Sequence, residues 1–293
     1  MYINVVFTAL ALLFITIIAW NSREALAPLA STINVNMLVI ATTVWVVAQL
    51  LPPVFTWIQF HHWPVNSSYQ RLLWIHLNRL PSKYLPGGIW NSLSRSGDYL
   101  LGGLPGRVTA SYLTLEMAVS ALISLWVGSA ILLSTMVSSD VAVIVFLMSS
   151  LVGILALAML GRFSFWIHQV PNYRFRGSRL VLGSLAIGFF WLMAGASFYL
   201  YFSAFNYTDT AIAKTNIVGA YIFSWGIGFV TLIAPQGIGV SEIVASKLIS
   251  VEVDFSELIT VIAGFRLVTA TGDLAAWSLG KVANLAGLSC VRQ

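Results

Sequence analysis

The sequence predicts an all-helical integral membrane protein with about six transmembrane helices and two re-entrant helical hairpins, arranged as an inverted repeat. The first observation is the composition: 58% of the 293 residues are hydrophobic, 9% are charged, and the mean hydropathy is +0.87. Soluble domains carry about 25% charged residues, so this composition excludes a soluble fold. A spanning helix needs about 20 mostly apolar residues, which leaves room for roughly six to eight spans. The second and third observations are a repeated short pattern and the distribution of basic residues.

Six apolar stretches are long enough to cross a membrane. We expect spans at residues 3–21, 37–60, 108–134, 141–161, 180–203 and 257–283. Pro52 and Pro53 should kink or end the second span, because proline lacks a backbone N–H. The first span is expected to stay uncleaved, since no basic region of a signal peptide precedes it. We expect one domain over residues 1–293, and the single cysteine, Cys290, excludes an intrachain disulfide.

The pattern P-x-G-I-x-x-S occurs at residues 86–92 and again at 235–241, 149 residues later. Proline and glycine together favour a break in a helix, because proline fixes φ and glycine permits tight turns. Short helices are expected to begin after the breaks, at Trp90 and at Val240. We therefore expect the surrounding segments, 66–106 and 211–250, to be re-entrant hairpins. Matching breaks in two halves of a membrane protein point to a transport site.

The distribution of Lys and Arg supports this arrangement. With a cytoplasmic N-terminus, eleven basic residues lie on the cytoplasmic side: Arg71, Arg79, Lys83, Arg95, Arg107, Arg162, Arg174, Arg176, Arg179, Lys281 and Arg292. Three lie on the other side, namely Arg23, Lys214 and Lys247, and Arg266 lies inside the membrane. This asymmetry obeys the positive-inside rule. If the second hairpin were two full spans, the following topology would not change, so the charges leave that alternative open.

Each half of the chain then crosses the membrane three times. The halves comprise about residues 1–136 and 137–285, and an odd number of crossings inverts the second half relative to the first. The two hairpins are expected to enter from opposite faces and to meet near the midplane. Broken backbone at that depth must line a cavity or be buried in protein. Both termini are expected to be cytoplasmic.

Three motifs resemble the transmembrane flippase-like region of the lysylphosphatidylglycerol synthase/flippase family. They are the run from Tyr84 to Trp90 followed by Arg95, the run from Pro235 to Glu242, and Phe265-Arg266-Leu267. The resemblance covers nearly the whole chain and implies lipid translocation, because the soluble synthase domain of the family is absent. The family often has Arg before the Glu of the second motif, where this chain has Ser241, and often has Glu-Arg where this chain has Glu116-Met117. Both departures remove a positive charge, so the lipid specificity of the family does not transfer.

Substrate-binding residues are expected at the two breaks and in the spans that follow them. The candidates are Pro86, Gly87, Gly88, Trp90, Ser92, Arg95, Glu116, Pro235, Gly237, Gly239, Ser241, Glu242, Arg266 and Asp273. Free backbone N–H groups and the positive dipole end at the start of each short helix attract anions such as phosphate. The serine hydroxyls can add hydrogen bonds. The alternative is that both breaks are kinks that serve packing alone.

Charges in the expected spans have two interpretations, because a charge at mid-bilayer costs about 3 kcal/mol and is normally paired or functional. Glu116 and Arg266 can form a structural ion pair with each other. Alternatively, Arg266 holds a lipid phosphate and Glu116 is its counter-ion or a proton carrier. Asp273, seven residues after Arg266, is another possible partner for it. Glu242 either caps its helix or binds a proton or a coupling cation.

Three functions are compatible with these features. The first is a transporter, not an enzyme, that moves an anionic phospholipid or a polyprenyl-phosphate-linked glycan precursor between the leaflets of a prokaryotic cytoplasmic membrane. The second is an integral-membrane transferase acting on lipid-linked sugars or headgroups, and the third is a non-transporting partner of envelope glycan or lipid enzymes. No cofactor is expected, and the four histidines lack metal-ligand spacing. Cytoplasmic loops explain the net charge of +5 better than a nucleic-acid partner does.

Overall fold

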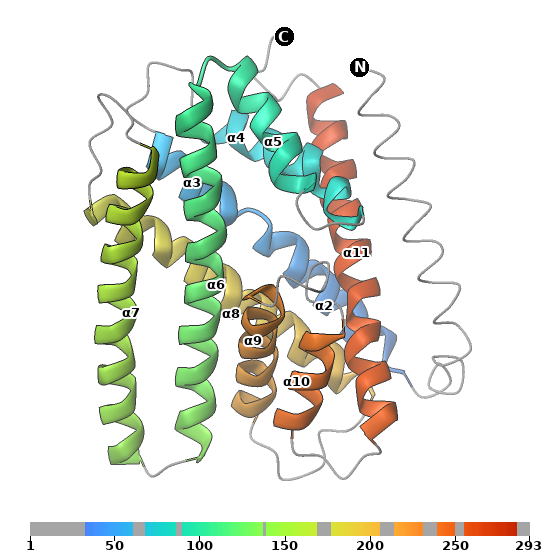
Figure 1. Ribbon diagram of the computed structural model, residues 1–293. Helices are drawn as coiled ribbons and strands as arrows, with labels where there is room; N and C mark the ends of the chain where they lie inside the picture. Colours follow the sequence, from blue (N-terminus) through green and yellow to red (C-terminus); the bar gives the residue numbers. More distant parts are fainter. Residues whose placement is uncertain are drawn as a thin grey trace.

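The computed structural model describes residues 33–60, 68–85, 90–136, 139–168, 177–205, 214–230, 239–249 and 255–285, and nearly all of these residues lie in helices (Figure 1). The expected first span, 3–21, lies outside the described residues, as do the proline and glycine residues at 86–88 and at 235–237. The all-helical class is confirmed for the part of the chain that the structure describes.

Four segments are long and apolar enough to cross a membrane. They are Val35–Phe60, Gly106–Thr135, Gly177–Ser203 and Glu257–Ala283, with lengths of 26 to 30 residues. These four segments coincide with the spans expected at 37–60, 108–134, 180–203 and 257–283. The chain therefore has the helices of an integral membrane protein.

The helices that contain these segments are α2 and α3, α6, α8 and α11. Helix α2 (Val35–Ala48) ends just before Pro52, where α3 (Pro52–Phe60) begins, so the expected interruption at the paired prolines is confirmed. The others are α6 (Gly106–Met136), α8 (Gly177–Ser203) and α11 (Phe255–Leu285). A further helix, α7 (Ser139–His168), covers the span expected at 141–161 and contains the apolar stretch Phe146–Ala156.

Shorter helices form the two interrupted segments. The first contains α4 (Tyr69–Arg79), the 3-10 helix η1 (Leu80–Tyr84) and α5 (Trp90–Leu101). The second contains α9 (Lys214–Val230) and α10 (Val240–Leu248). The expected starts at Trp90 and Val240 are both confirmed. We refer to α4–η1–α5 as the first hairpin and to α9–α10 as the second hairpin.

The two hairpins lie toward opposite ends of the long helices. In Figure 1, α4 and α5 lie at the upper end of the molecule and α9 and α10 at the lower end. The contacts along α6 agree: Glu116, in its N-terminal half, bonds to Arg95 of the first hairpin, whereas Gly128, in its C-terminal half, packs against Phe223 of the second. Helix α6 thus contacts the first hairpin near one end and the second hairpin near the other.

Helices α6 and α11 occupy matching places in the two halves of the chain. Both are 31 residues long, and α11 begins and ends 149 residues after α6. The offset equals the spacing of the repeated pattern. Helix α6 packs against α8 and α9 of the second half, and α11 packs against α2 and, less extensively than α6 on α9, against α4 of the first.

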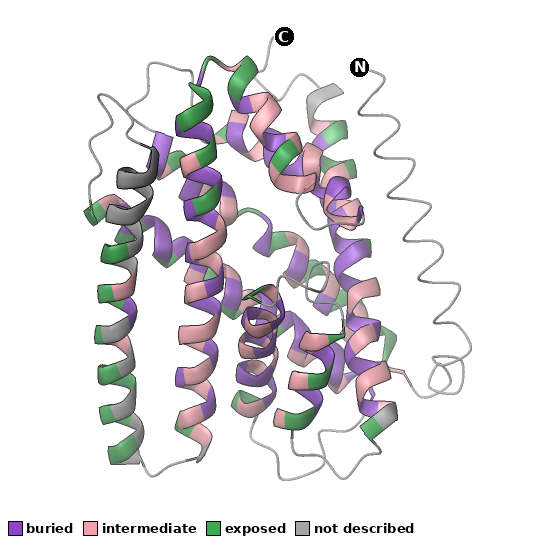
Figure 2. Ribbon diagram, in the orientation of Figure 1, coloured by how far each residue is buried: buried purple, intermediate pink, exposed green. Residues whose placement is uncertain are grey.

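The core between the halves is built around α8. Phe198 and Phe202 of α8 are fully buried, and the Ser197 hydroxyl donates a hydrogen bond of 2.8 Å to the Ala41 carbonyl of α2. Gly183 of α8 lies directly against the Phe55 ring of α3. The outer face is apolar and exposed along α7, as Figure 2 shows in green. An exposed apolar face of this kind suits contact with lipid tails.

Candidate functional site

The second break brings an arginine, a glutamate and a serine together. Arg266 of α11 donates from Nε to Glu242 Oε1 at 2.6 Å and from Nη2 to Ser241 Oγ at 3.3 Å. Ser241 Oγ in turn donates to Glu242 Oε2 at 2.9 Å. Three of the candidates predicted from the sequence therefore form one polar cluster, which we call the Arg266 cluster.

Helix α10 begins in a conformation that only glycine adopts easily. Gly239 has φ of +87°, in the region where a side chain would be strained. Its N–H donates to Glu242 Oε2 at 2.7 Å, which satisfies one of the free donors at the start of α10. The capping interpretation of Glu242 is confirmed by this bond. The same carboxylate thus binds both the helix start and the guanidinium.

Arg266 is accessible although it lies well inside a candidate span. It is the twelfth of the 31 residues of α11, and its side chain is 29% exposed, against 7% for Glu242. Its Nη1 has no hydrogen bond within the described residues. A guanidinium at this depth retains an edge that can donate hydrogen bonds to the oxygens of a phosphate or carboxylate.

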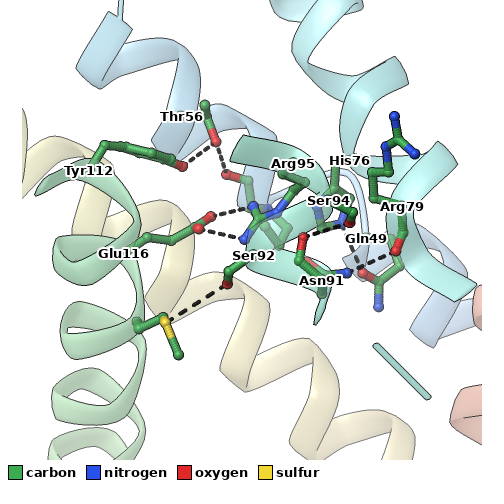
Figure 3. Close-up of polar contacts among 12 residues, drawn as sticks. Gln49, Thr56, His76, Arg79, Asn91, Ser92, Ser94, Arg95, Tyr112 and Glu116 are labelled. Carbon is green, nitrogen blue, oxygen red and sulfur yellow. Dashed lines mark hydrogen bonds and ion pairs between the residues drawn. The ribbon is translucent and has the colours of Figure 1, made fainter. Parts of the chain in front are cut away.

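The first break contains a second arginine–glutamate pair with the opposite order along the chain. Arg95 of α5 donates from Nη1 and Nη2 to the two carboxylate oxygens of Glu116 on α6, at 2.9 and 2.7 Å (Figure 3). Both side chains are buried, at 8% and 9% exposure. The planar fork-to-carboxylate geometry is the strongest form of such a pair. This pair fixes the first hairpin against α6.

Other polar groups surround this buried pair. Tyr112 lies one turn before Glu116 on α6, and its hydroxyl is 2.6 Å from that of Thr56 on α3. Ser92, at the start of α5, donates to Met117 Sδ at 3.8 Å (Figure 3). Both Ser92 and Met117 are partly exposed. The first break therefore presents a hydroxyl and a thioether where the second presents a hydroxyl and a guanidinium.

Asp273 of α11 binds the first hairpin rather than Arg266. Tyr84 donates to Asp273 Oδ2 at 2.7 Å, Trp45 of α2 donates from Nε1 to Oδ1 at 2.8 Å, and Lys83 forms an ion pair with the same carboxylate. The Lys83 ammonium also lies 5.1 Å from the Trp45 ring centroid, a cation–π distance. Asp273 is 1% exposed. It joins η1, α2 and α11 in one contact.

The structure corrects two expected pairings. Glu116 does not pair with Arg266, because each is bound by a residue of the hairpin that precedes its helix: Arg95 for Glu116 and Glu242 for Arg266. Asp273 is likewise not the partner of Arg266. Seven residues separate the two along α11, a rise of about 10 Å that the short aspartate side chain does not bridge. Arg95, a substrate-binding candidate, is buried against Glu116.

Several polar residues in or beside the first hairpin were missed by the sequence analysis. Lys83 was assigned to cytoplasmic topology alone, and Trp45 and Tyr84 were not candidates at all. His76 of α4 and Gln49, which follows α2, were also missed; their side chains are buried and lie 3.2 Å apart from Nε2 to Oε1. The one available signal was position, since Lys83 and Tyr84 immediately precede the first break.

Of the remaining substrate-binding candidates, the structure describes Trp90 but not the prolines and glycines of the two breaks. Trp90 is the first residue of α5, whereas Pro86, Gly87, Gly88, Pro235 and Gly237 lie outside the described residues. Among the described residues, no three His, Cys, Asp or Glu side chains are grouped as metal ligands would be. No protein-family model and no curated protein matches the chain.

Proposed function

We propose that this protein translocates a phosphate-bearing lipid between the leaflets of a membrane. The observation that carries the proposal is the accessible guanidinium of Arg266 inside the candidate span of α11, tethered to the start of α10 by Glu242. A charge at this depth costs about 3 kcal/mol and normally has a functional role. Anionic phospholipids and polyprenyl-phosphate-linked glycan precursors are the substrate classes that match this charge.

The proposed topology is an inverted repeat of three crossings per half, with two re-entrant hairpins. Three observations support it: the 149-residue offset of α6 and α11, their reciprocal packing, and the opposite ends at which the hairpins lie (Figure 1). Inverted repeats with broken helices are a common plan of secondary transporters. The distribution of basic residues favours the cytoplasmic side for the first hairpin, and the membrane we propose is a prokaryotic inner membrane.

In the proposed mechanism, the lipid phosphate binds the open edge of Arg266 while the tails stay in the bilayer. The N–H groups at the start of α10 add a positive dipole end at the same place. The Arg95–Glu116 pair is buried and has its charges matched, so it serves to hold the first hairpin in position. Substrate binding by Arg95 or Glu116 stays a prediction, and their burial argues for the structural role.

The proposal is tested by lipid flux in proteoliposomes containing a fluorescent phosphatidylglycerol. The Arg266→Gln/Glu242→Gln variant removes the accessible pair without leaving a single unpaired charge. We expect flux to fall at least about tenfold, the effect of losing a charge-assisted contact worth about 1.5–3 kcal/mol. Purified protein must still insert and remain monodisperse.

The matched control is Arg79→Gln/Asp98→Asn. This variant also removes one arginine and one acid, joined by two bonds of 2.6 Å, but the pair lies on the first hairpin, away from the Arg266 cluster. Its flux should stay within about twofold of wild type. Equal flux in wild type and in the Arg266/Glu242 variant would reject the assigned site.

The two alternatives predict different results in the same preparation. A transferase forms a new product from a labelled lipid-linked donor, and a non-transporting partner co-purifies with an envelope enzyme and shows no flux alone. Absence of flux in the wild-type protein, together with either result, would replace the transporter proposal.

A further inference from the structure

Two contacts at the breaks are related by the repeat. Ser92 on α5 contacts Met117 on α6, and Ser241 on α10 contacts Arg266 on α11. Ser241 follows Ser92 by 149 residues, and Arg266 follows Met117 by the same number. Met117 and Arg266 are each the twelfth residue of a 31-residue helix. The same contact between break serine and long helix is thus made once in each half.

The four residues share their degree of exposure as well as their position. Ser92, Met117, Ser241 and Arg266 are all partly exposed, whereas the acids beside them, Glu116 and Glu242, are buried. The two halves therefore differ at this contact in the charge of the residue on the long helix. The second half presents a cation and the first presents a neutral thioether.

Among the described cations around these contacts, Arg95 is paired with Glu116 and is 8% exposed, and Lys83 is paired with the buried Asp273. Arg266 is also paired, with Glu242, but its side chain is 29% exposed and its Nη1 is left for a ligand. A second negative charge on a ligand would therefore meet no cation on the side of Met117. An uncompensated charge at this depth costs about 3 kcal/mol, so a doubly charged headgroup is disfavoured.

We propose that Met117 is a specificity-determining residue: it occupies the position equivalent to Arg266 and restricts the site to headgroups that carry one negative charge. This inference rests on the proposed function and names its substrate class more closely. Lipids with a single phosphodiester belong to this class. Lipids with a second phosphate do not.

The test compares two lipids with the same tails. Dioleoyl phosphatidylglycerol carries one negative charge, and dioleoyl phosphatidylglycerol phosphate adds a second phosphate to the same headgroup. Native mass spectrometry of the purified protein with both lipids in equal amounts gives the ratio of the two complexes. The wild-type protein should favour phosphatidylglycerol. Met117→Arg should shift the ratio toward the second lipid by about tenfold, since it adds one charge-assisted contact.

Leu101→Arg is the control for an added charge. Leu101 is 89% exposed at the end of α5, away from the contact, so its variant should keep the wild-type ratio. A wild-type ratio in folded Met117→Arg protein would overturn the proposal. If neither Met117→Arg nor Met117→Lys inserts while Leu101→Arg does, the position does not accept a cation, and the equivalence with Arg266 is rejected.

Moving the positive charge from position 266 to position 117 tests directly whether the two positions are equivalent. Arg266→Met/Glu242→Gln removes the cation from the second half and should abolish phosphatidylglycerol binding. Adding Met117→Arg to that variant should restore binding to within about tenfold of wild type, because the cation returns at the equivalent contact. A structural role of Met117 would give no such rescue, and its absence would overturn the proposal.

The two proposals fail in distinguishable ways. If the wild-type protein binds neither lipid and shows no flux, the proposed function is wrong. If it binds and moves phosphatidylglycerol, but Met117→Arg leaves the selectivity unchanged and rescues nothing, only the assignment of Met117 is wrong.

Discussion

Arg266 and Asp273 lie two turns apart on α11 and are bound by different hairpins. Arg266 is held by Glu242 of the second hairpin, and Asp273 is held by Lys83 and Tyr84 of the first. Helix α11 therefore connects the two breaks over about 10 Å. Any movement of one hairpin relative to the other must break or shift one of these contacts.

Asp273→Asn is expected to destabilise the first hairpin. The substitution keeps the shape of the side chain but removes the charge of Asp273, which is 1% exposed and pairs with the 25% exposed Lys83. Loss of a buried charge partner costs about 3 kcal/mol, so the melting temperature in detergent should fall clearly. Asp98→Asn is the comparison, because the Asp98 side chain is 22% exposed, against 1% for Asp273. Its effect should be about 1 kcal/mol or less, and an equal loss in both variants would contradict this prediction.

The Arg95–Glu116 pair should behave as a structural unit in a double-mutant cycle. Arg95→Gln and Glu116→Gln each leave one buried charge without its partner, and each should cost about 3–5 kcal/mol. The double variant should be more stable than either single variant, because no unpaired charge remains. Thermal unfolding in detergent measures all three.

Flux measurements separate this role from substrate binding. If the pair only positions the first hairpin, the double variant that inserts correctly retains flux. Loss of flux in a stable double variant would instead show that Arg95 and Glu116 take part in substrate binding.

Hydropathy and the repeated pattern were sufficient to predict the long helices and both helix starts after the breaks. The four candidate spans match, and α5 and α10 begin at Trp90 and Val240 as expected. These features depend on local sequence: apolar length sets a span, and a proline followed by glycine sets a break. The sequence also predicted that Ser241, Glu242 and Arg266 belong to one candidate site. Ser241 and Glu242 are adjacent in sequence at the break, and Arg266 lies in the span that follows it.

The partners of the buried charges could not be predicted in the same manner. The pairing of Glu116 with Arg95 depends on how the first hairpin lies along α6, which spacing along the chain does not determine. Asp273 finds its partners in the other half of the chain, 189 and 228 residues away. Such contacts follow from tertiary packing, so the charged residues of the expected spans could be named from the sequence but their partners could not.

The glycines between α6 and α9 should be intolerant of a methyl group. A Cβ atom at Gly128 would lie 2.4 Å from the backbone nitrogen of Phe223, so Gly128→Ala must push the two helices apart. Close approach at small residues is a main source of helix association in membranes. We expect the Gly128→Ala protein to have a lower melting temperature than wild type and to give a smaller yield of monodisperse protein.

Gly97→Ala is the matched substitution in a helix with free space. No atom lies within 4 Å of the added Cβ at Gly97 on α5, so alanine should be neutral or stabilise the helix by up to about 1 kcal/mol. Equal destabilisation by both alanine variants would show that the α6–α9 contact is not as close as described.

Cysteine labelling from each side of the membrane tests the inverted arrangement of the hairpins. In a Cys290→Ser background, Leu101→Cys places a thiol at the exposed end of α5, and Lys247→Cys places one at the exposed end of α10. With the first hairpin on the cytoplasmic side and the second on the opposite side, a membrane-impermeant maleimide added outside intact cells should label only the Lys247→Cys protein. Inside-out vesicles should reverse the result. Labelling of both proteins from one side would mean that the hairpins share a face, and the inverted repeat would then be rejected.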